Sequence, residues 1–326
     1  YRSSRGLGDV YKRQSLQLDL FLEFKIMRAK KLFALSALIF FTSSITASVS
    51  FYGKLNFSSE SEDSAEESNT DFVNNASRIG IKGNFKLNDK YSLIFQAENE
   101  IDPTDGKADG EKVFKERNTF VGIKGDFGKL YAGTYDSALK LGQLKVDLFN
   151  DTRADIKYIL QGENRMNSFV GYESPELIEG MKVSLNSISQ SSGDFYSYSI
   201  TYKTENINSA LSVDKDAKGF DSTRLALMFA VYKFDIGLLL QNSKKISTNK
   251  KDEGHIFSIN RKLSDKSSIY FQNAKSDMKI DDGEQRSFGY TYKINDKTKI
   301  FIHQSSRESS NKGKVDYISL GTEYKF

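Results

Sequence analysis

The sequence predicts an all-β protein, a transmembrane antiparallel β-barrel of sixteen strands. Apolar and polar side chains alternate with a period of two through most of the chain, and turn residues separate the runs. Tyr-Lys pairs recur at multiples of about thirty residues, the length of two strands and their loop, beginning at Tyr202, Tyr232, Tyr292 and Tyr324. An aromatic ring beside a lysine suits a membrane–water interface, where the ring lies at headgroup depth and the ammonium extends into water.

The expected strands follow this alternation in order. They are 49–57, 77–86, 90–100, 116–125, 128–136, 156–173, 181–190, 195–204, 207–214, 223–233, 235–243, 254–263, 267–276, 285–294, 297–305 and 314–326. Where a further Tyr-Lys pair is due, Asn260-Arg261-Lys262 ends the strand. A fourteen-strand count stays open, because the hairpin around 156–190 has the weakest alternation.

Short turns alternate with longer polar loops such as 58–76 and 243–253. This asymmetry is typical of outer-membrane barrels, whose short turns face the periplasm. Residues 58–71 carry six carboxylates and no cation, so we expect them in water. Binding of divalent cations there is an alternative to a simple solvated charge run.

The first 47 residues are expected to be absent from the mature barrel. A basic start at Met27, an apolar run of ten from Leu32 and small residues up to Ala47 predict a signal peptide over 27–47. Its apolar run is too short to span a bilayer. Residues 1–26 fit neither signal nor barrel and resemble non-native upstream sequence, the alternative being a genuine extension. The barrel is then expected over 48–326.

Composition excludes several classes of function. The mature chain has 39 basic and 40 acidic residues, so it lacks the positive balance that nucleic-acid binding needs. The absence of cysteine excludes thiol chemistry and cysteine-ligated metals. We therefore expect no nucleic-acid partner, no cofactor and no metal site.

Five segments carry a resemblance to a known family. They are Ser50–Lys54, Ser77–Gly83, Glu116–Gly125, Asn164–Pro175 and Tyr317–Phe326. In this order they resemble the general porins of Gram-negative bacteria. The resemblance implies an outer-membrane homotrimer that contacts lipid and lipopolysaccharide and lets small hydrophilic solutes and ions diffuse passively. It also implies that Tyr324 and Phe326 form the signal read by the barrel-assembly machinery.

The resemblance further implies a constriction with a basic wall at Lys54, Arg78, Arg117 and Arg165. Alternation alone places Lys54 and Arg78 on polar strand faces. The strand phase of Arg117 would also turn Val121 and Ile123 inward, and Phe169 is in phase with Arg165. The alternative for each is an ordinary solvated cation of the lumen or surface.

The third loop, from Tyr135 to about Asp155, is expected to fold into the lumen. It contains an unusual number of apolar side chains, at Leu139, Leu141, Leu144, Val146, Leu148 and Phe149. These would form an exposed apolar patch in water. Packed on the inner wall, they would leave Asp147 and Asp151 facing the opening. The alternative is a lid packed outside on a neighbouring subunit.

Other functions stay open at this point. A substrate-specific channel would line its lumen with aromatic residues, and a structural or adhesive barrel would conduct nothing. A lipase-like barrel would need His255 or His303 beside a nucleophile. Neither histidine lies in a recognisable catalytic context, so we expect no enzyme.

Overall fold

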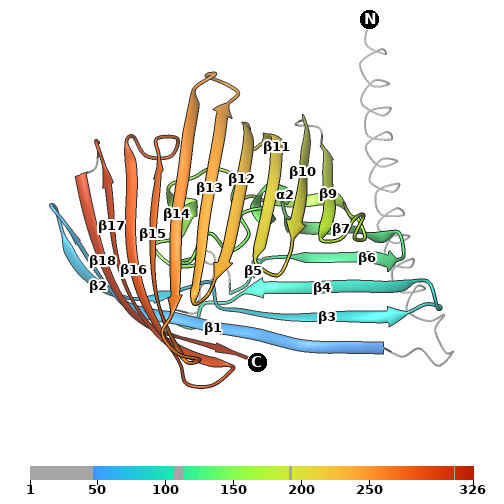
Figure 1. Ribbon diagram of the computed structural model, residues 1–326, viewed down its shortest axis with the longest axis horizontal. Helices are drawn as coiled ribbons and strands as arrows, with labels where there is room; N and C mark the ends of the chain where they lie inside the picture. Colours follow the sequence, from blue (N-terminus) through green and yellow to red (C-terminus); the bar gives the residue numbers. More distant parts are fainter. Residues whose placement is uncertain (1–46, 106–112, 191–192, 312) are drawn as a thin grey trace, which may run out of the picture. The chain divides into compact units, whose positions relative to one another are not determined.

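Eighteen strand segments form one antiparallel sheet that closes on itself, in a computed structural model that describes residues 47–105, 113–190, 193–311 and 313–326 (Figure 1). The first half comprises β1 (Ala47–Ser64), β2 (Ser68–Asn74), β3 (Arg78–Lys86), β4 (Ser92–Glu100), β5 (Lys115–Glu116), β6 (Thr119–Gly125), β7 (Gly128–Asp136), β8 (Arg165–Glu173) and β9 (Met181–Gln190). The second half comprises β10 (Gly193–Lys203), β11 (Ile207–Ala217), β12 (Phe220–Val231), β13 (Phe234–Lys245), β14 (Lys251–Lys262), β15 (Ser267–Ser276), β16 (Gly283–Lys293), β17 (Thr298–Ser309) and β18 (Gly313–Lys325).

The barrel has sixteen strands, because two of them are interrupted. β2 and β3 lie end to end along β1, and β5 and β6 lie end to end along β4. Pairing of β1 with β18 closes the sheet. The sixteen-strand prediction is confirmed and the fourteen-strand alternative is excluded. The predictions for residues 1–26 and 27–47 fall on 1–46, outside the described residues, except for Ala47.

Two expected boundaries are wrong. The strand expected over 156–173 begins at Arg165, and the residues before it include a short 3₁₀ helix, η1 (Ile156–Tyr158). The first loop, expected over 58–76, is instead a hairpin of β1 and β2. Polar residues on both faces of this hairpin conceal its alternation. Its Glu60 is buried, contrary to the solvated run expected, and accepts hydrogen bonds from Arg153 Nε (2.7 Å) and Ser319 Oγ (2.8 Å).

The aromatic strand ends lie together at one rim. Every other strand of an antiparallel sheet runs the same way, so five strands end at the rim that carries the short turns (Figure 1). They are β10, β12, β14, β16 and β18. Tyr202, Tyr292 and Tyr324 are exposed on the outer face, and Tyr232, in the turn after β12, is the most exposed. No helix among the described residues is long and apolar enough to cross a membrane.

The C-terminal residue completes the closure. Phe326 N donates to Gly53 O (3.1 Å), and Gly53 N donates to Phe326 O (3.0 Å). A Cβ at Gly53 would stand 2.2 Å from the Phe326 ring, so the ring fits only because position 53 lacks a side chain. The ring also lies 5.6 Å from that of Phe51, centroid to centroid.

Candidate functional site: a charged lumen

The segment between β7 and β8, residues 137–164, lies inside the barrel, and we call it the inward loop. It begins with the single-turn helix α2 (Ala138–Leu141), whose cap is Ser137: its Oγ accepts from Lys140 N (3.2 Å). An apolar cluster joins the loop to the inner faces of β12–β15. Its members are Val146, Ile156, Ile159, Leu160, Ala226, Leu239, Ile256 and Ala274. The predicted infolding is confirmed, although Leu141 is exposed to the lumen.

Arg224 of β12 fastens the base of this loop. Its guanidinium is fully buried and donates to Glu163 Oε1 (2.9 Å), Gln161 O (3.0 Å) and Leu139 O (3.3 Å). Asp214, on the neighbouring strand β11, accepts from residues at the two ends of the loop. Its Oδ2 accepts from Ser137 Oγ (3.2 Å) and Asn164 Nδ2 (3.1 Å). The two side chains hold both ends of the loop on one wall.

Asp151 lies between two cations of the opposite wall. Its carboxylate is 2.7 Å from Lys54 Nζ on β1 and also contacts the Arg78 guanidinium on β3. Burial alone would raise the pKa of Asp151, but Lys54, Arg78 and Arg117 outweigh it and hold the pKa well below its ordinary value. Asp151 therefore stays ionised, and its backbone is left-handed (φ 70°), a conformation that aspartate tolerates.

Arg117 faces the lumen despite its strand phase. It lies in the break between β5 and β6, so the alternation is reset, and Val121 and Ile123 point outward and are exposed. Its guanidinium donates to Glu98 Oε1 (2.7 Å) and Glu100 Oε2 (2.9 Å) on β4.

Arg165 also lies inside, where it meets the start of the inward loop. Its Nε is 3.0 Å from Asp136 Oδ1 and donates to Asn118 Oδ1 (2.8 Å), and Lys140 Nζ is 3.1 Å from the same carboxylate. Phe169 is inside as well, in a buried cluster with Tyr131. The register of β7 with β8 shifts between Arg165 and Phe169, so alternation does not link their directions, and the structure places both inside.

Asp147 does not face the opening as expected. Its carboxylate accepts from Phe149 N (3.0 Å), Ile156 N (3.3 Å) and Gln272 Nε2 (3.3 Å), and its side chain is buried. Burial and the neighbouring Asp155 raise the pKa of Asp147 well above its ordinary value. It organises the loop against the wall rather than lining the lumen.

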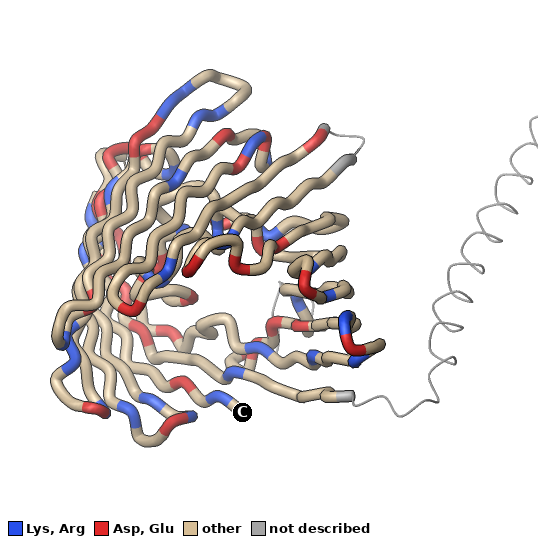
Figure 2. The backbone as a smooth tube through the Cα atoms, turned by 45° about the vertical axis from the view of Figure 1, so that its right-hand side comes forward, with Lys and Arg blue, Asp and Glu red and all other residues tan. Residues whose placement is uncertain are grey.

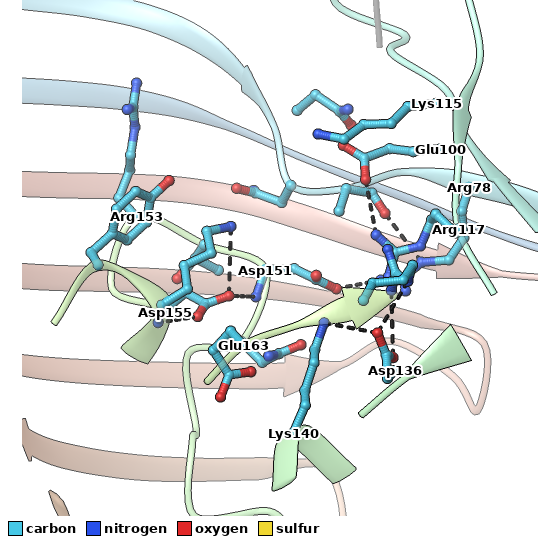
Figure 3. A pocket seen from close by; sticks show the side chains of 18 of the residues that line it. Arg78, Glu100, Lys115, Arg117, Asp136, Lys140, Asp151, Arg153, Asp155 and Glu163 are labelled. Atoms are coloured by element: carbon cyan, nitrogen blue, oxygen red, sulfur yellow. Dashed lines mark hydrogen bonds and ion pairs between the residues drawn. The ribbon is translucent and has the colours of Figure 1, made fainter. Parts of the chain in front are cut away.

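Arg78, Arg117, Arg165 and Asp151 border one cavity of about 1150 Å³, whose lining does not include Lys54 (Figure 3). Its cations are Arg78, Lys115, Arg117, Lys140, Arg153, Lys157, Arg165, Lys218 and Lys279. Its carboxylates are Asp71, Glu100, Asp102, Asp105, Asp136, Asp151, Asp155 and Glu163. The inward loop touches the wall formed by β1 and β3 at Asp151, and it also reaches β1 through Arg153, whose Nε lies 2.7 Å from Glu60 Oε1. The cavity lies beside these contacts.

The sequence missed the partners of the basic wall. Glu98 and Glu100 occupy alternate positions of β4, and Glu100 is the register partner of Arg78. Opposite charges at matched positions of adjacent expected strands were the available signal. Arg224 offered no such signal, since its partners belong to an irregular loop.

The two histidines have different surroundings. His303 Nε2 lies 2.7 Å from Tyr270 Oη, and its ring stacks on Phe301 and meets the edge of Phe149 from the inward loop. His255 is exposed on β14. Their described contacts are those of wall and surface residues.

Comparison with known proteins agrees with this architecture. The family model described as "Gram-negative porin" matches residues 34–326. The chain is 27% identical over 229 residues to a major outer membrane protein P.IB of Neisseria meningitidis serogroup B, covering 60% of this chain and 68% of that one. It is 30% identical over 110 residues to the P.IB protein of Neisseria sicca, covering 32% and 30%.

Solved structures share the fold at low identity. An anion-selective porin from Comamonas acidovorans superposes with a TM-score of 0.75 at 17% identity, over 86% of this chain and 100% of that one. OmpF of Salmonella typhi, in complex with daunomycin, gives 0.68 at 13%, over 85% and 97%. The trimer form of OmpT of Vibrio cholerae gives 0.64 at 14%, over 86% and 99%.

Proposed function

Since the chain belongs to the Gram-negative porin family, we propose that Lys54, Arg78, Arg117 and Arg165 form the basic side of its pore constriction, with Asp151 opposite. The protein is an outer-membrane porin, a passive diffusion channel for small hydrophilic solutes. Passage through such a pore depends on its diameter and on the charges that line it. Asp147 has no place in the constriction we propose, because its side chain is buried and its carboxylate accepts hydrogen bonds from Phe149 N and Gln272 Nε2.

The observation that carries this proposal is the position of Asp151. A carboxylate on the inward loop and two cations on β1 and β3 set up a field across the lumen at the level where the loop narrows it. A small polar solute keeps most of its hydration in the cavity beside them, whereas an apolar solute would have to displace water ordered by those charges.

Several further properties belong to the proposal. We propose that the chain acts without covalent chemistry, and that it assembles as a homotrimer in contact with lipid and lipopolysaccharide, as one structural neighbour is a trimer. We propose that Tyr324 and Phe326 are read by the barrel-assembly machinery, since both stand at the closing edge. We also propose that residues 27–47 are a signal peptide and that 1–26 are not native.

The test is a pair of opposite substitutions measured by reversal potential in a potassium chloride gradient. Arg78→Gln should shift the reversal potential toward cation preference, and Asp151→Asn should shift it toward anion preference, because each removes one charge from the same contact. Lys251→Gln is the matched control: it removes a cation from the outward-phased end of β14 far along the strand from this contact.

The control should leave the reversal potential unchanged. If Arg78→Gln and Asp151→Asn behaved like the control, neither residue would belong to the constriction. A shift of the same sign for both would contradict the opposed-charge arrangement.

A further inference from the structure

Three of the four lysines of the Tyr-Lys pairs lie on lumen-facing strand positions, as does Lys262 where a pair is missing, and Tyr202, Tyr292 and Tyr324 face outward. Lys233 lies in the turn between β12 and β13. Lys203 shares a strand face with Ser197, whose hydroxyl accepts from Leu139 N of the inward loop (3.2 Å). Lys262 shares a face with Ile256, which packs against the same loop. The ammonium groups therefore extend into the water of the lumen mouth, while the aromatic rings beside them face outward.

The other two lysines follow the same rule. Lys293 shares a face with Gln285, which donates to Ala154 O of the inward loop (2.6 Å). Lys325 Nζ is 3.1 Å from Glu323, a buried carboxylate that also lies 3.9 Å from Lys54 Nζ. The repeat thus places ammonium groups inside the mouth that the short turns surround.

Lysines of the remaining strands complete a ring at this mouth. By the same alternation, ten lysines lie on lumen-facing positions near the short-turn ends of the strands, and we call them the lysine ring. They are Lys82, Lys86, Lys124, Lys129, Lys182, Lys203, Lys262, Lys293, Lys299 and Lys325. Two contacts support the inward direction on the first half: Lys82 lies over the ring of Tyr52 (5.1 Å) and Lys129 over that of Tyr131 (4.4 Å).

Carboxylates balance only part of this charge. Asp89, Glu173, Asp235 and Glu323 form ion pairs with five of the ten lysines. The other five have no ion-pair partner among the residues that the structure describes. They are Lys82, Lys124, Lys182, Lys203 and Lys293. Apart from Asp89, the short turns add six carboxylates and four lysines, and Figure 2 colours both kinds along the backbone. Fourteen lysines against ten carboxylates leave the mouth positive.

Two ring members, Lys262 and Lys293, and two turn lysines surround a hollow suited to an oxyanion. Lys233, Lys262, Lys266 and Lys293 border a space of about 440 Å³, together with hydroxyl groups such as that of Thr291. Asp265 is the one carboxylate in its lining. Ammonium and hydroxyl donors around such a space match the acceptor oxygens of phosphate-like anions.

We propose that the lysine ring is a periplasmic anion vestibule, which concentrates small multivalent oxyanions and makes anion entry from the periplasm faster than from outside. This inference rests on the proposed function, since it needs an open pore. At about 10 Å in water and about 0.1 M salt, one unpaired lysine raises the local concentration of a monovalent anion about 1.3-fold. The net excess of four positive charges at the mouth raises it about threefold. At about 1 M salt the effect almost vanishes, because the Debye length falls to about 3 Å.

The test is the current–voltage curve of single channels in 0.1 M and 1 M potassium chloride. The wild type should pass more current when anions enter from the short-turn side, by up to about threefold at 0.1 M, and should be symmetric at 1 M. The triple variant Lys203→Gln/Lys262→Gln/Lys293→Gln should lose most of this asymmetry. Sodium pyrophosphate should reduce the wild-type current at lower concentration from the short-turn side than from the other.

A cysteine variant makes the test independent of whether a substitution impairs folding and of the direction in which the barrel inserts into the bilayer. The chain has no cysteine, so Lys293→Cys can be modified within a conducting channel. A cationic methanethiosulfonate should restore the asymmetry, an anionic one should reduce it further, and the side from which the reagent acts identifies the short-turn mouth. Lys251→Cys, on the outward face at the other end of the barrel, is the control.

The outcomes separate the two claims. Symmetric wild-type current at 0.1 M, or asymmetry that neither the triple variant nor the anionic reagent changes, would overturn the vestibule and leave the porin intact. Absence of conductance from folded protein would overturn both.

Discussion

Arg224→Met tests how the inward loop is held. The substitution removes one buried cation, so the Glu163 carboxylate and Leu139 O lose their Arg224 donor, whereas Gln161 O keeps the hydrogen bond from Gln241 Nε2. Breaking a buried ion pair by removing one partner costs about 3–5 kcal/mol. Burial already raises the pKa of Glu163, against the opposing charge of Arg224. Without that charge Glu163 takes up a proton, so we expect the lower end of the range.

The rest of the loop should stay docked. Val146, Ile156, Ile159 and Leu160 are fully buried, and each contributes about 1.5–3 kcal/mol of apolar burial. Their sum exceeds the loss at Arg224. We therefore expect an intact barrel whose loop base is loosened, rather than a loop released from the lumen.

Single-channel recording provides the assay. The Arg224→Met channel should show excess open-channel current noise and transitions to a larger conductance, while gel mobility of the unheated protein reports a folded barrel. Adding Glu163→Gln should recover much of the loss, because a neutral glutamine avoids the cost of protonating the buried carboxylate. Wild-type noise and conductance in Arg224→Met, or no recovery in the double variant, would refute this account of the loop.

Three further results are expected. Gly53→Ala should lower the thermal stability of the folded barrel, because its Cβ would overlap the Phe326 ring; unchanged heat-dependent gel mobility would contradict the packing. Arg117→Gln should shift the reversal potential toward cation preference, since it leaves two carboxylates of β4 unbalanced. A shift toward anion preference would exclude Arg117 from the basic side of the constriction. Because Asp151 has a depressed pKa, its contribution to loop docking is present above the ordinary pKa of about 4 and is lost only as the pH falls through the lower folded value. Titration of Asp151 should therefore not change the conductance between pH 7 and pH 4. A conductance transition in this range that is present in the wild type and absent from Asp151→Asn would contradict the depressed pKa.

The alternation of side chains was sufficient to predict the strand order and the closure, because a barrel wall imposes inside and outside on every strand. It failed where both faces were polar, as in the hairpin of β1 and β2. It also failed where a strand is broken, as at Arg117, since an interruption resets the phase. Neither a hairpin with two polar faces nor a break within a strand can be recognised from the local alternation of apolar and polar residues.

The inward loop shows a second limit. Its apolar residues predicted that it folds inside, because nothing else could cover Val146 or Phe149. They could not predict which carboxylate faces the lumen. Asp147 and Asp151 differ only in the path of the backbone between them, and that path depends on wall residues distant in sequence, such as Gln272.

The most direct test of the central claim is reconstitution of the purified, folded protein into a planar bilayer. The account predicts stepwise, ohmic conductance in 1 M potassium chloride, where the surface charges are screened, and permeation of small neutral sugars in liposome swelling that ends sharply with solute size. Folded protein that inserts without conductance steps and passes no sugar would contradict it.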